Sequence, residues 1–265
     1  MKLSGKTVWI TGASSGIGEA LASEYVKRGA RVILSSPEVE KLNALNDSFN
    51  AFRPGSSLVV PLDLERGEDI PGIVAKTVEQ AVRIDILING AGISQRSLVI
   101  ETPLEIDRKI FEINYFGAVT LTKSLLPHMI SKGGGAVAVI SSIAGKFGFP
   151  MRSAYSASKH ALHGFFETVR AELKKENIKV TIICPGRVRT NISVNAITKD
   201  GKSYGIMDRG QLKGISPEKC ARKIIRSIAR KRKEVYAGST ELLMVFIKRY
   251  FPRIFYMLSS KIKPA

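Results

Sequence analysis

Short apolar runs alternate with longer amphipathic stretches along most of this chain. Apolar runs lie at residues 7–10, 31–34, 58–62, 86–89, 136–140, 179–183 and 234–238. Helical periodicity extends over residues 17–28, 38–52, 70–82, 104–131 and 153–177, with a break expected near Pro127. Strands that are apolar throughout and alternate with helices predict a parallel sheet covered on both faces. We therefore expect an α/β fold, doubly wound, with a seven-stranded parallel sheet flanked by helices.

The strand–helix pattern ends near residue 240. We expect one domain over residues 1–240 and a tail over 241–265 that is not an independent domain. Residues 191–214 are polar, contain glycine and follow the carboxyl end of a predicted strand, where ligands bind in open α/β sheets. This stretch could form a lid over a ligand or an ordinary surface loop, and the sequence supports both interpretations.

The composition and the pattern of apolar residues indicate in which cellular compartment the protein lies. Two cysteines, Cys184 and Cys220, are too few for a disulfide framework and indicate a reducing compartment. Residues 1–6 lead directly into a strand-like segment, so we expect no signal peptide. No apolar stretch reaches the roughly 18 residues of a spanning helix. We expect a cytoplasmic protein.

The formal net charge of +18 suggests an anionic partner, which could be nucleic acid, a membrane surface or an acidic substrate. No RNA-binding signature, zinc spacing or basic recognition helix is evident, so we expect no nucleic-acid partner. His128, His160 and His163 are scattered, with no cysteine or carboxylate cluster, and we assign them structural or surface positions and no metal.

A glycine-rich turn follows the first predicted strand and opens a helix. Glycines allow close approach of the backbone to a pyrophosphate, and the helix N-terminus offers N–H groups to that anion. In this context a dinucleotide site is favoured over a simple turn. The expected binding residues of this turn are Gly12, Ser14, Ser15, Gly16, Ile17 and Gly18.

The end of the second strand commonly selects the cofactor, because an acid there binds a ribose 2′-OH and repels a 2′-phosphate. Ser35, Ser36 and Pro37 follow Leu34, without an acid. We therefore expect NADP(H), with NAD(H) as the alternative.

Polar or small residues also follow the third, fourth and sixth strands, where a bound nucleotide would lie. The candidates are Asp63, Leu64, Asn89, Ala91, Gly92, Pro185, Gly186, Val188 and Thr190. Helix caps and simple turns are the competing interpretations.

Tyr155 and Lys159 are one helical turn apart, so they share a helix face. A nearby ammonium favours the phenolate form of a tyrosine, which suits it to general acid/base catalysis. Ser141 and Ser142 follow the fifth strand and can hold a carbonyl oxygen or cap the next segment. Asn114 can distort its helix or be an ordinary exposed asparagine.

These motifs together resemble the short-chain dehydrogenase/reductase family, which has the Rossmann fold. Residues 11–18 match its T-G-x-x-x-G-x-G, and residues 155–159 match its Y-x-x-x-K. Its N-N-A-G appears here as residues 89–92 with glycine at the second position. The resemblance covers about residues 5–240, and the segment around Tyr155 is most similar to hydroxysteroid dehydrogenases and membrane-associated reductases of lipid-like carbonyls.

The resemblance implies a catalytic set of Asn114, Ser142, Tyr155 and Lys159, with Ser142 chosen over Ser141. Tyr155, its pKa lowered by Lys159 and nicotinamide charge, would give a proton to the substrate oxygen as hydride arrives. Ser142 would polarise that oxygen, Lys159 would also bind the nicotinamide ribose together with Tyr155, and Asn114 would support a relay through water. The expected activity interconverts a secondary alcohol and a ketone on a hydrophobic, lipid- or steroid-like substrate.

The resemblance also implies a homodimer or homotetramer in which the helices at 104–131 and 153–177 pair across a two-fold axis. Phe165, Phe166 and Val169 suit such a face or the domain's own core. The alternative function is a non-catalytic dinucleotide-binding or peripheral membrane-binding protein on the same fold.

The tail places apolar and aromatic residues beside basic ones. Residues 242–265 contain no acid and five basic residues, namely Lys248, Arg249, Arg253, Lys261 and Lys263. Pro252 should divide the tail into two short helices. Such a segment suits the surface of an anionic membrane. Packing over the substrate cleft or a neighbouring subunit is the alternative.

Overall fold

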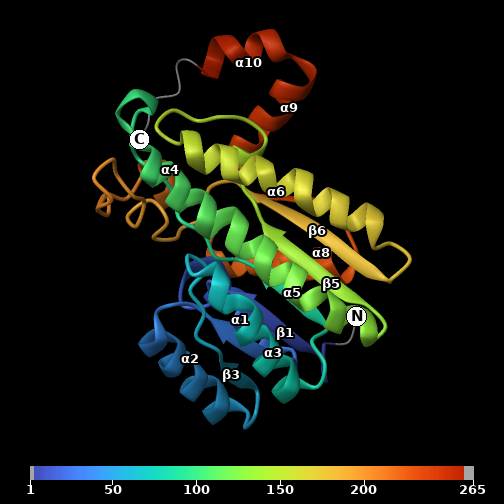
Figure 1. Ribbon diagram of the computed structural model, residues 1–265. Helices are drawn as coiled ribbons and strands as arrows, with labels where there is room; N and C mark the ends of the chain where they lie inside the picture. Colours follow the sequence, from blue (N-terminus) through green and yellow to red (C-terminus); the bar gives the residue numbers. More distant parts are fainter. Residues whose placement is uncertain (1–2, 260–265) are drawn as a thin grey trace.

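A computed structural model describes residues 3–259. Within this range the strands form one sheet in the order β3-β2-β1-β4-β5-β6-β7, with every neighbouring pair parallel. They are β1 (Thr7–Thr11), β2 (Arg31–Ser35), β3 (Ser57–Val59), β4 (Ile86–Asn89), β5 (Gly135–Ile140), β6 (Ile178–Pro185) and β7 (Glu234–Ala237). The predicted doubly wound, seven-stranded fold is confirmed, and Figure 1 shows its twist.

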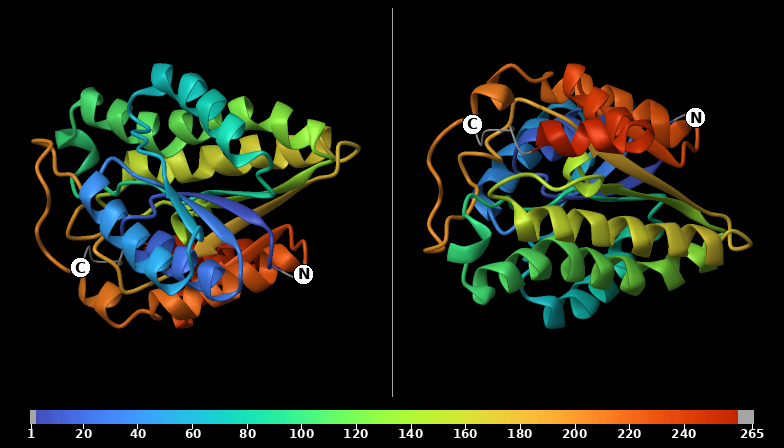
Figure 2. Two further views of the ribbon diagram at one scale, coloured as in Figure 1. Left: turned by 90° about the horizontal axis from the view of Figure 1, so that it is seen from below. Right: turned by 90° about the horizontal axis from the view of Figure 1, so that it is seen from above.

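Helices cover both faces of the sheet (Figures 1 and 2). One apolar layer joins the sheet to α1, α2 and α8, and a second joins it to α3, α5 and α6. The helices are α1 (Gly16–Lys27), α2 (Val39–Phe52), α3 (Ile70–Ala81), α4 (Leu104–Phe111), α5 (Gly117–Ser131), α6 (Ser153–Glu172), α7 (Arg209–Leu212), α8 (Pro217–Ala229), α9 (Leu243–Tyr250) and α10 (Pro252–Ser259). The strands are apolar throughout because neither face of the sheet meets water.

The break predicted near Pro127 lies elsewhere. Pro127 is inside α5, which continues through it, and its neighbours Leu125, Leu126 and Met129 are buried against the sheet. That packing offsets the one backbone hydrogen bond that a proline removes. The interruption is instead a π-helical segment, Glu112–Phe116, between α4 and α5. Asn114 lies in this segment and is buried.

α6 ends at Glu172, five residues earlier than the periodicity indicates. Asn177 has a positive φ of 58° and its side-chain amide donates to the Gly133 carbonyl at 3.0 Å. This left-handed residue turns the chain into β6, so residues 173–177 form a connection and not a final helical turn.

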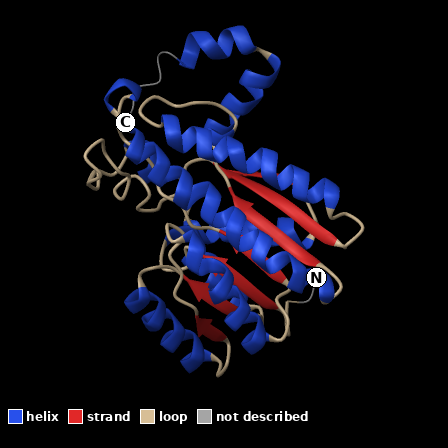
Figure 3. Cartoon of the chain, in the orientation of Figure 1, coloured by secondary structure: helices blue, strands red, loops and turns tan. Residues whose placement is uncertain are grey.

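The long connections gather at the ends toward which the strand arrows point (Figure 3). One of them, residues 191–214, contains α7 and bridges to Gln95 through Ile197. The tail folds as two short helices on either side of Phe251, as predicted, and Lys261 and Lys263 lie outside the described residues. Over residues 3–259, each helix is too short or too polar to cross a membrane.

Candidate active site

A cavity of about 630 Å³ opens at the carboxyl edge of the sheet. A volume of this size suits a small-molecule or cofactor site. Most of the predicted site residues line it, namely Gly12, Ser14, Ser15, Gly16, Ile17, Gly18, Ser36, Asp63, Leu64, Ala91, Gly92, Ser142, Tyr155, Lys159, Pro185, Gly186, Val188 and Thr190. Ser35, Asn89 and Asn114 are not among the lining residues.

Ser35 and Asn89 hold strands together below the cavity. The Ser35 hydroxyl accepts from Trp9 Nε1 at 2.8 Å and donates to the Val60 carbonyl at 2.7 Å. The Asn89 amide donates to Thr122 Oγ1 at 3.0 Å. Both side chains are buried. The Ser35 hydroxyl both donates and accepts internally, whereas Asn89 Oδ1 has no hydrogen-bond partner within residues 3–259.

The glycine-rich turn fits a pyrophosphate because it is closely packed from behind. Gly12 has a positive φ of 68°, and a Cβ added to it would lie 2.8 Å from Ala91 Cα. A Cβ on Gly18 would lie 2.0 Å from the Gly12 carbonyl oxygen. Glycine alone permits this approach, which places the N-terminus of α1 at the cavity.

An acid that the sequence pattern did not reveal lies beside the residues that would select the cofactor. Glu38 lines the cavity and accepts from the Ser14 hydroxyl at 2.6 Å. Ser36 Oγ lies 2.9 Å from Ser14 Oγ and accepts from the Glu38 amide. Hydrogen bonds from Lys41 and then Ser14 lower the pKa of Glu38. The residues directly after β2 carry no acid, but the chain turns back at Pro37 and brings Glu38 into the same group.

Two hydrogen bonds hold the turn that follows β6 against β7 and the start of the tail. The Gly186 amide donates to the Ala237 carbonyl, and the Arg187 amide donates to Glu241 Oε1 at 2.8 Å. β7 and the start of the tail therefore pair both amides within the protein.

Asn114 lies behind the cavity wall and fixes the chain after β4. Its Oδ1 accepts from the Ile93 amide at 2.8 Å, and its Nδ2 donates to the Ile93 carbonyl and to Ser158 Oγ. Both amide protons are thus used, and one acceptor position remains on Oδ1. A Cβ on Gly92 would lie within 3.1 Å of both Asn114 Oδ1 and Lys159 Nζ, so this glycine lets the two side chains converge.

Burial has the largest effect on the pKa of Tyr155. Burial raises the pKa of Tyr155, against the lowering effects of a Ser142 hydrogen bond, Arg152 and Arg96. Lys159 Nζ lies 5.8 Å from the centre of the Tyr155 ring and donates to the Ile140 carbonyl at 3.0 Å. Burial lowers the pKa of Lys159 to about 8. The groups that oppose the effect of burial on the Tyr155 pKa are thus Ser142, Arg152 and Arg96, and the charge role expected of Lys159 stays a prediction.

Arg96, Arg152 and Asp208 form a buried charged group in the cavity wall that the sequence motifs did not identify. Asp208 Oδ2 accepts from Arg96 Nη2 and, at 2.8 Å, from Arg152 Nη2. Two guanidinium groups share one carboxylate, so a positive charge remains beside Tyr155. Asp208 comes from residues 191–214, and this ion pair therefore joins that segment to α6. Nothing in the local sequence marks the pair of Arg96 and Asp208, since 112 residues separate its members.

His163 lies one turn beyond Lys159 and organises a hydrogen-bonded network under the site. Ser141 Oγ donates to the Lys159 carbonyl at 3.1 Å and lies 3.0 Å from His163 Nε2. Lys146 Nζ lies 3.1 Å from His163 Nδ1. Because Lys146 can only donate, Nδ1 accepts and Nε2 carries the proton given to Ser141. The network thus runs in one direction, from Lys146 to the backbone of Lys159.

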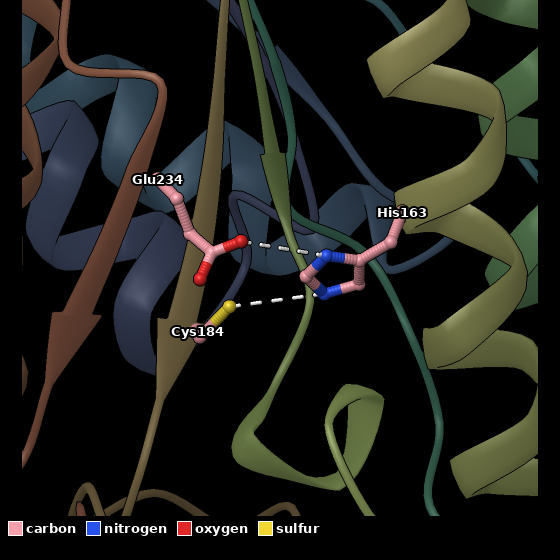
Figure 4. Close-up of side chains that lie close together, drawn as sticks. All are labelled: His163, Cys184 and Glu234. Atoms are coloured by element: carbon pink, nitrogen blue, oxygen red, sulfur yellow. Dashed lines mark hydrogen bonds and ion pairs between the residues drawn. The ribbon is translucent and has the colours of Figure 1, made fainter. Parts of the chain in front are cut away.

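The fold also brings Cys184 and Glu234 to His163, although no such cluster was expected (Figure 4). Cys184 Sγ lies 3.8 Å from Nε2, and Glu234 Oε2 lies 3.8 Å from Nδ1, so they face opposite ring nitrogens. Lys146 Nζ bonds the same Glu234 oxygen at 2.7 Å. Burial raises the pKa of Cys184 to about 12, which keeps the thiol protonated. An ammonium group supplies the positive charge here, and we interpret the cluster as a structural network.

The fold and the glycine-rich turn in this cavity are those of the dinucleotide-binding class of proteins. The short chain dehydrogenase family profile matches residues 6–201. Dehydrogenase/reductase SDR family protein 7-like from Drosophila melanogaster is 40% identical over 98% of this chain and 81% of its own. Dehydrogenase/reductase SDR family member 7B from Bos taurus is 41% identical, over 96% and 80%. The chain belongs to the short-chain dehydrogenase/reductase family.

Solved structures agree with this assignment. A short-chain dehydrogenase from Streptomyces avermitilis has a TM-score of 0.83 and 31% identity, covering 98% of this chain and 97% of its own. A short-chain dehydrogenase/reductase from Burkholderia phymatum, in complex with NAD, has a TM-score of 0.83 over 100% and 99% of the chains. Its identity of 21% shows the shared fold. The protein is thus an enzyme of CH–OH and C=O chemistry, in a family that binds nicotinamide dinucleotides.

The His163 network predicts a specific dependence of stability on pH. Burial, followed by the charge of Lys146, lowers the pKa of His163 from 6.5 to about 4, with Glu234 opposing and His160 and Arg170 adding to the effect. The unfolded chain therefore binds this proton first as the pH falls. The free energy of unfolding should decrease between pH 6.5 and 4, by up to about 3 kcal/mol from this residue.

Urea unfolding of wild type and His163→Gln across this range measures the effect. Glutamine keeps a donor for Ser141 and does not titrate. The wild type should lose more stability than the variant on acidification, and other acids cancel in the comparison. Parallel pH curves for the two proteins would contradict the assignment.

Proposed function

We propose that this enzyme interconverts a secondary alcohol and a ketone on a hydrophobic, lipid- or steroid-like substrate with NAD(P)(H), using Asn114, Ser142, Tyr155 and Lys159. The observation that carries this proposal is that Ser142, Tyr155 and Lys159 line the same cavity as the glycine-rich turn. Two hydroxyl groups that border one cavity can bind one substrate oxygen from two sides.

The rest of the cavity supports an apolar substrate. Beyond the two hydroxyls, Ile143, Phe147, Phe149, Pro150 and Met244 line it. These residues come from the segment after β5 and from the tail. They would exclude water and hold an extended hydrocarbon surface.

The bound nicotinamide cofactor supplies or accepts the hydride. Tyr155 Oη gives its proton to the substrate oxygen in the reducing direction and removes it in the oxidising direction. Ser142 Oγ holds the same oxygen. Lys159 Nζ binds the ribose beside Tyr155, and its lowered pKa suits it to pass a proton onward. The remaining acceptor position on Asn114 Oδ1 would hold a water next to Lys159 in that relay.

Replacing Tyr155 with Phe tests this mechanism. The ring remains and the proton donor is lost, so kcat should fall by about 10²- to 10⁴-fold or more, while nucleotide affinity is retained. Turnover of a panel of steroids, ketones and 3-ketoacyl compounds measures kcat, and nucleotide fluorescence titration measures affinity. Near-normal turnover by Tyr155→Phe would reject the catalytic assignment. Nucleotide binding by the wild type without turnover of any compound would favour the non-catalytic alternative.

We propose NADP(H) as the cofactor, with NAD(H) as the alternative. Ser14 and Ser36 bring two hydroxyls together at the end of β2, and Lys41 adds a cation nearby. Glu38 opposes this preference, since its carboxylate occupies the Ser14 hydroxyl and would repel a 2′-phosphate. The side chain of Glu38 is 45% exposed and can turn toward solvent with Lys41.

The balance between Glu38 and Lys41 can be measured directly. Glu38→Gln should raise the affinity for NADP⁺ by about tenfold, because it removes a charge repulsion, and leave that for NAD⁺ nearly unchanged. Lys41→Gln, the matched control, should weaken NADP⁺ selectively. Calorimetric titration of both nucleotides gives the ratios. Tighter binding of NAD⁺ than NADP⁺ by the wild type would overturn the proposed preference.

We propose a homodimer or homotetramer formed through α5 and α6, which lie side by side on one face (Figure 1). Phe166 and Val169, two of the residues considered for this face, are buried in the protein's own core, so the core interpretation holds for them. Phe165 is half-buried and packs edge-on against Tyr115, which in turn contacts the exposed Phe116. These rings offer the apolar surface that a second copy would cover.

Light scattering tests this assembly. The wild type should be at least a dimer at micromolar concentration, and Phe116→Lys should shift it toward monomer by placing a charge in the interface. The control is Phe52→Lys, at an exposed apolar residue on α2, and it should leave the oligomeric state unchanged. A monomeric wild type would rule the assembly out.

A further inference from the structure

The tail helices α9 and α10 project from one end of the molecule, beyond α6 (Figures 1 and 2). Their inward side is apolar and well packed. Leu242, Met244, Val245 and Ile247 pack against a cluster formed by Ile143, Phe147 and Phe255. Phe255 is 3% exposed, and its ring lies 5.1 Å from that of Phe147. The tail therefore has a fixed position over the segment that follows β5.

The outward side of the same helices is also apolar, and it faces solvent. Its exposed residues are Leu243, Phe246, Tyr250 and Phe251, and α10 adds Ile254 and Tyr256 on the two sides of the buried Phe255. Leu243, Phe246 and Tyr250 recur at helical spacing on α9, so they form a continuous stripe. Phe246 is 53% exposed and Phe251 is 60% exposed. Aromatic side chains gathered in this way on a surface indicate something that covers them.

The charges beside this stripe indicate what covers it. Arg249 and Arg253 are exposed, and Arg249 stacks 5.7 Å above the Tyr250 ring. The sequence from 242 onward has no acid. A second copy docked on this face in a two-fold arrangement would bring two positive tails together without a compensating carboxylate on either. Anionic lipid headgroups would instead neutralise the arginines while the rings enter the acyl boundary.

We propose that the outward face of α9 and α10 is a docking surface for anionic lipid membranes, and that it holds the cleft mouth against the bilayer. The cleft mouth would lie against the bilayer because Thr240, Glu241 and Met244, at the start of the tail, form part of the cavity wall. This orientation rests on the proposed function, since it would supply an apolar substrate directly from the lipid. Each helix has eight residues, so the docking is interfacial.

Substitution tests the surface better than truncation does. A chain ending at Tyr250 would lose Phe255 and uncover Phe147, which would disturb the fold and the cavity. The variant Leu243→Ser/Phe251→Ser changes two side chains that are each 60% exposed and lie outside the packed cluster. Its matched control, Phe52→Ser/Ile100→Ser, removes two apolar residues that are at least as exposed and lie far from the tail in sequence. Circular dichroism and thermal unfolding verify that both variants are folded.

Co-sedimentation with phosphatidylcholine vesicles, with and without phosphatidylserine, measures binding. Wild type and control should bind the phosphatidylserine vesicles, less so as the ionic strength rises to about 0.5 M. The tail variant should bind about tenfold more weakly or worse. Arg249→Gln/Arg253→Gln should reduce the salt dependence. Equal binding by the tail variant, equal binding to pure phosphatidylcholine, or no binding by the wild type would each overturn the proposal.

Two further measurements distinguish lipid docking from self-association and from a direct effect on catalysis. If light scattering shows that the tail variant loses an oligomer that the control keeps, a second copy occupies this face and the lipid proposal is wrong. On a soluble ketone, wild type and tail variant should have equal kcat, and only the rate on vesicle-embedded substrate should fall. Vesicle binding without turnover of any substrate would refute the proposed function and leave the docking surface standing.

Discussion

The close packing of residues 90–93 between the nucleotide turn and Lys159 is the constraint on which the site depends. The Gly90 and Ala91 amides both donate to Thr11 Oγ1, at 3.0 and 3.3 Å. A Cβ on Gly90 would lie 2.7 Å from the Thr11 carbonyl oxygen. Two residues later, Ile93 is held through its amide and carbonyl by Asn114. One short segment thus sets the distance from the glycine-rich turn to α6, which carries Tyr155 and Lys159.

This packing explains two features that the sequence shows only as motifs. Glycine stands at residue 90, where the family pattern has asparagine, and the contact with Thr11 favours the smaller residue. Asn114 lies in the π-helical segment Glu112–Phe116, where the helix departs from regular α geometry. In this position its side chain reaches the backbone of Ile93. Such π segments cost backbone hydrogen bonds and often occur at functional sites. Here the side-chain bonds to Ile93 compensate.

Local sequence predicted the sheet and the order of its elements, and most of the site residues that it predicted line the cavity. Continuous apolar strands and glycine spacing carry that information within a few residues. Local sequence did not predict the ion pairs in and beneath the cavity wall. Arg96 meets Asp208, and His163 meets Glu234, only through tertiary folding. Glu38 lies only three residues beyond Ser35 in the sequence. Its place in the site could not be predicted, because it depends on the turn at Pro37 that brings Glu38 to Ser14. Pro127 shows the opposite error, because core packing overrode a local preference.

The electrostatics of Tyr155 follow from these tertiary contacts. A phenol in an apolar cavity is a weak acid, and burial alone would take Tyr155 further from physiological pH. The arginines that oppose this effect are held by Asp208, which belongs to residues 191–214. Any movement of that segment would carry Asp208 away and change the charge around the phenol. The segment that contributes this wall of the cavity therefore also holds, through one carboxylate, the two arginines whose charge acts on the pKa of Tyr155.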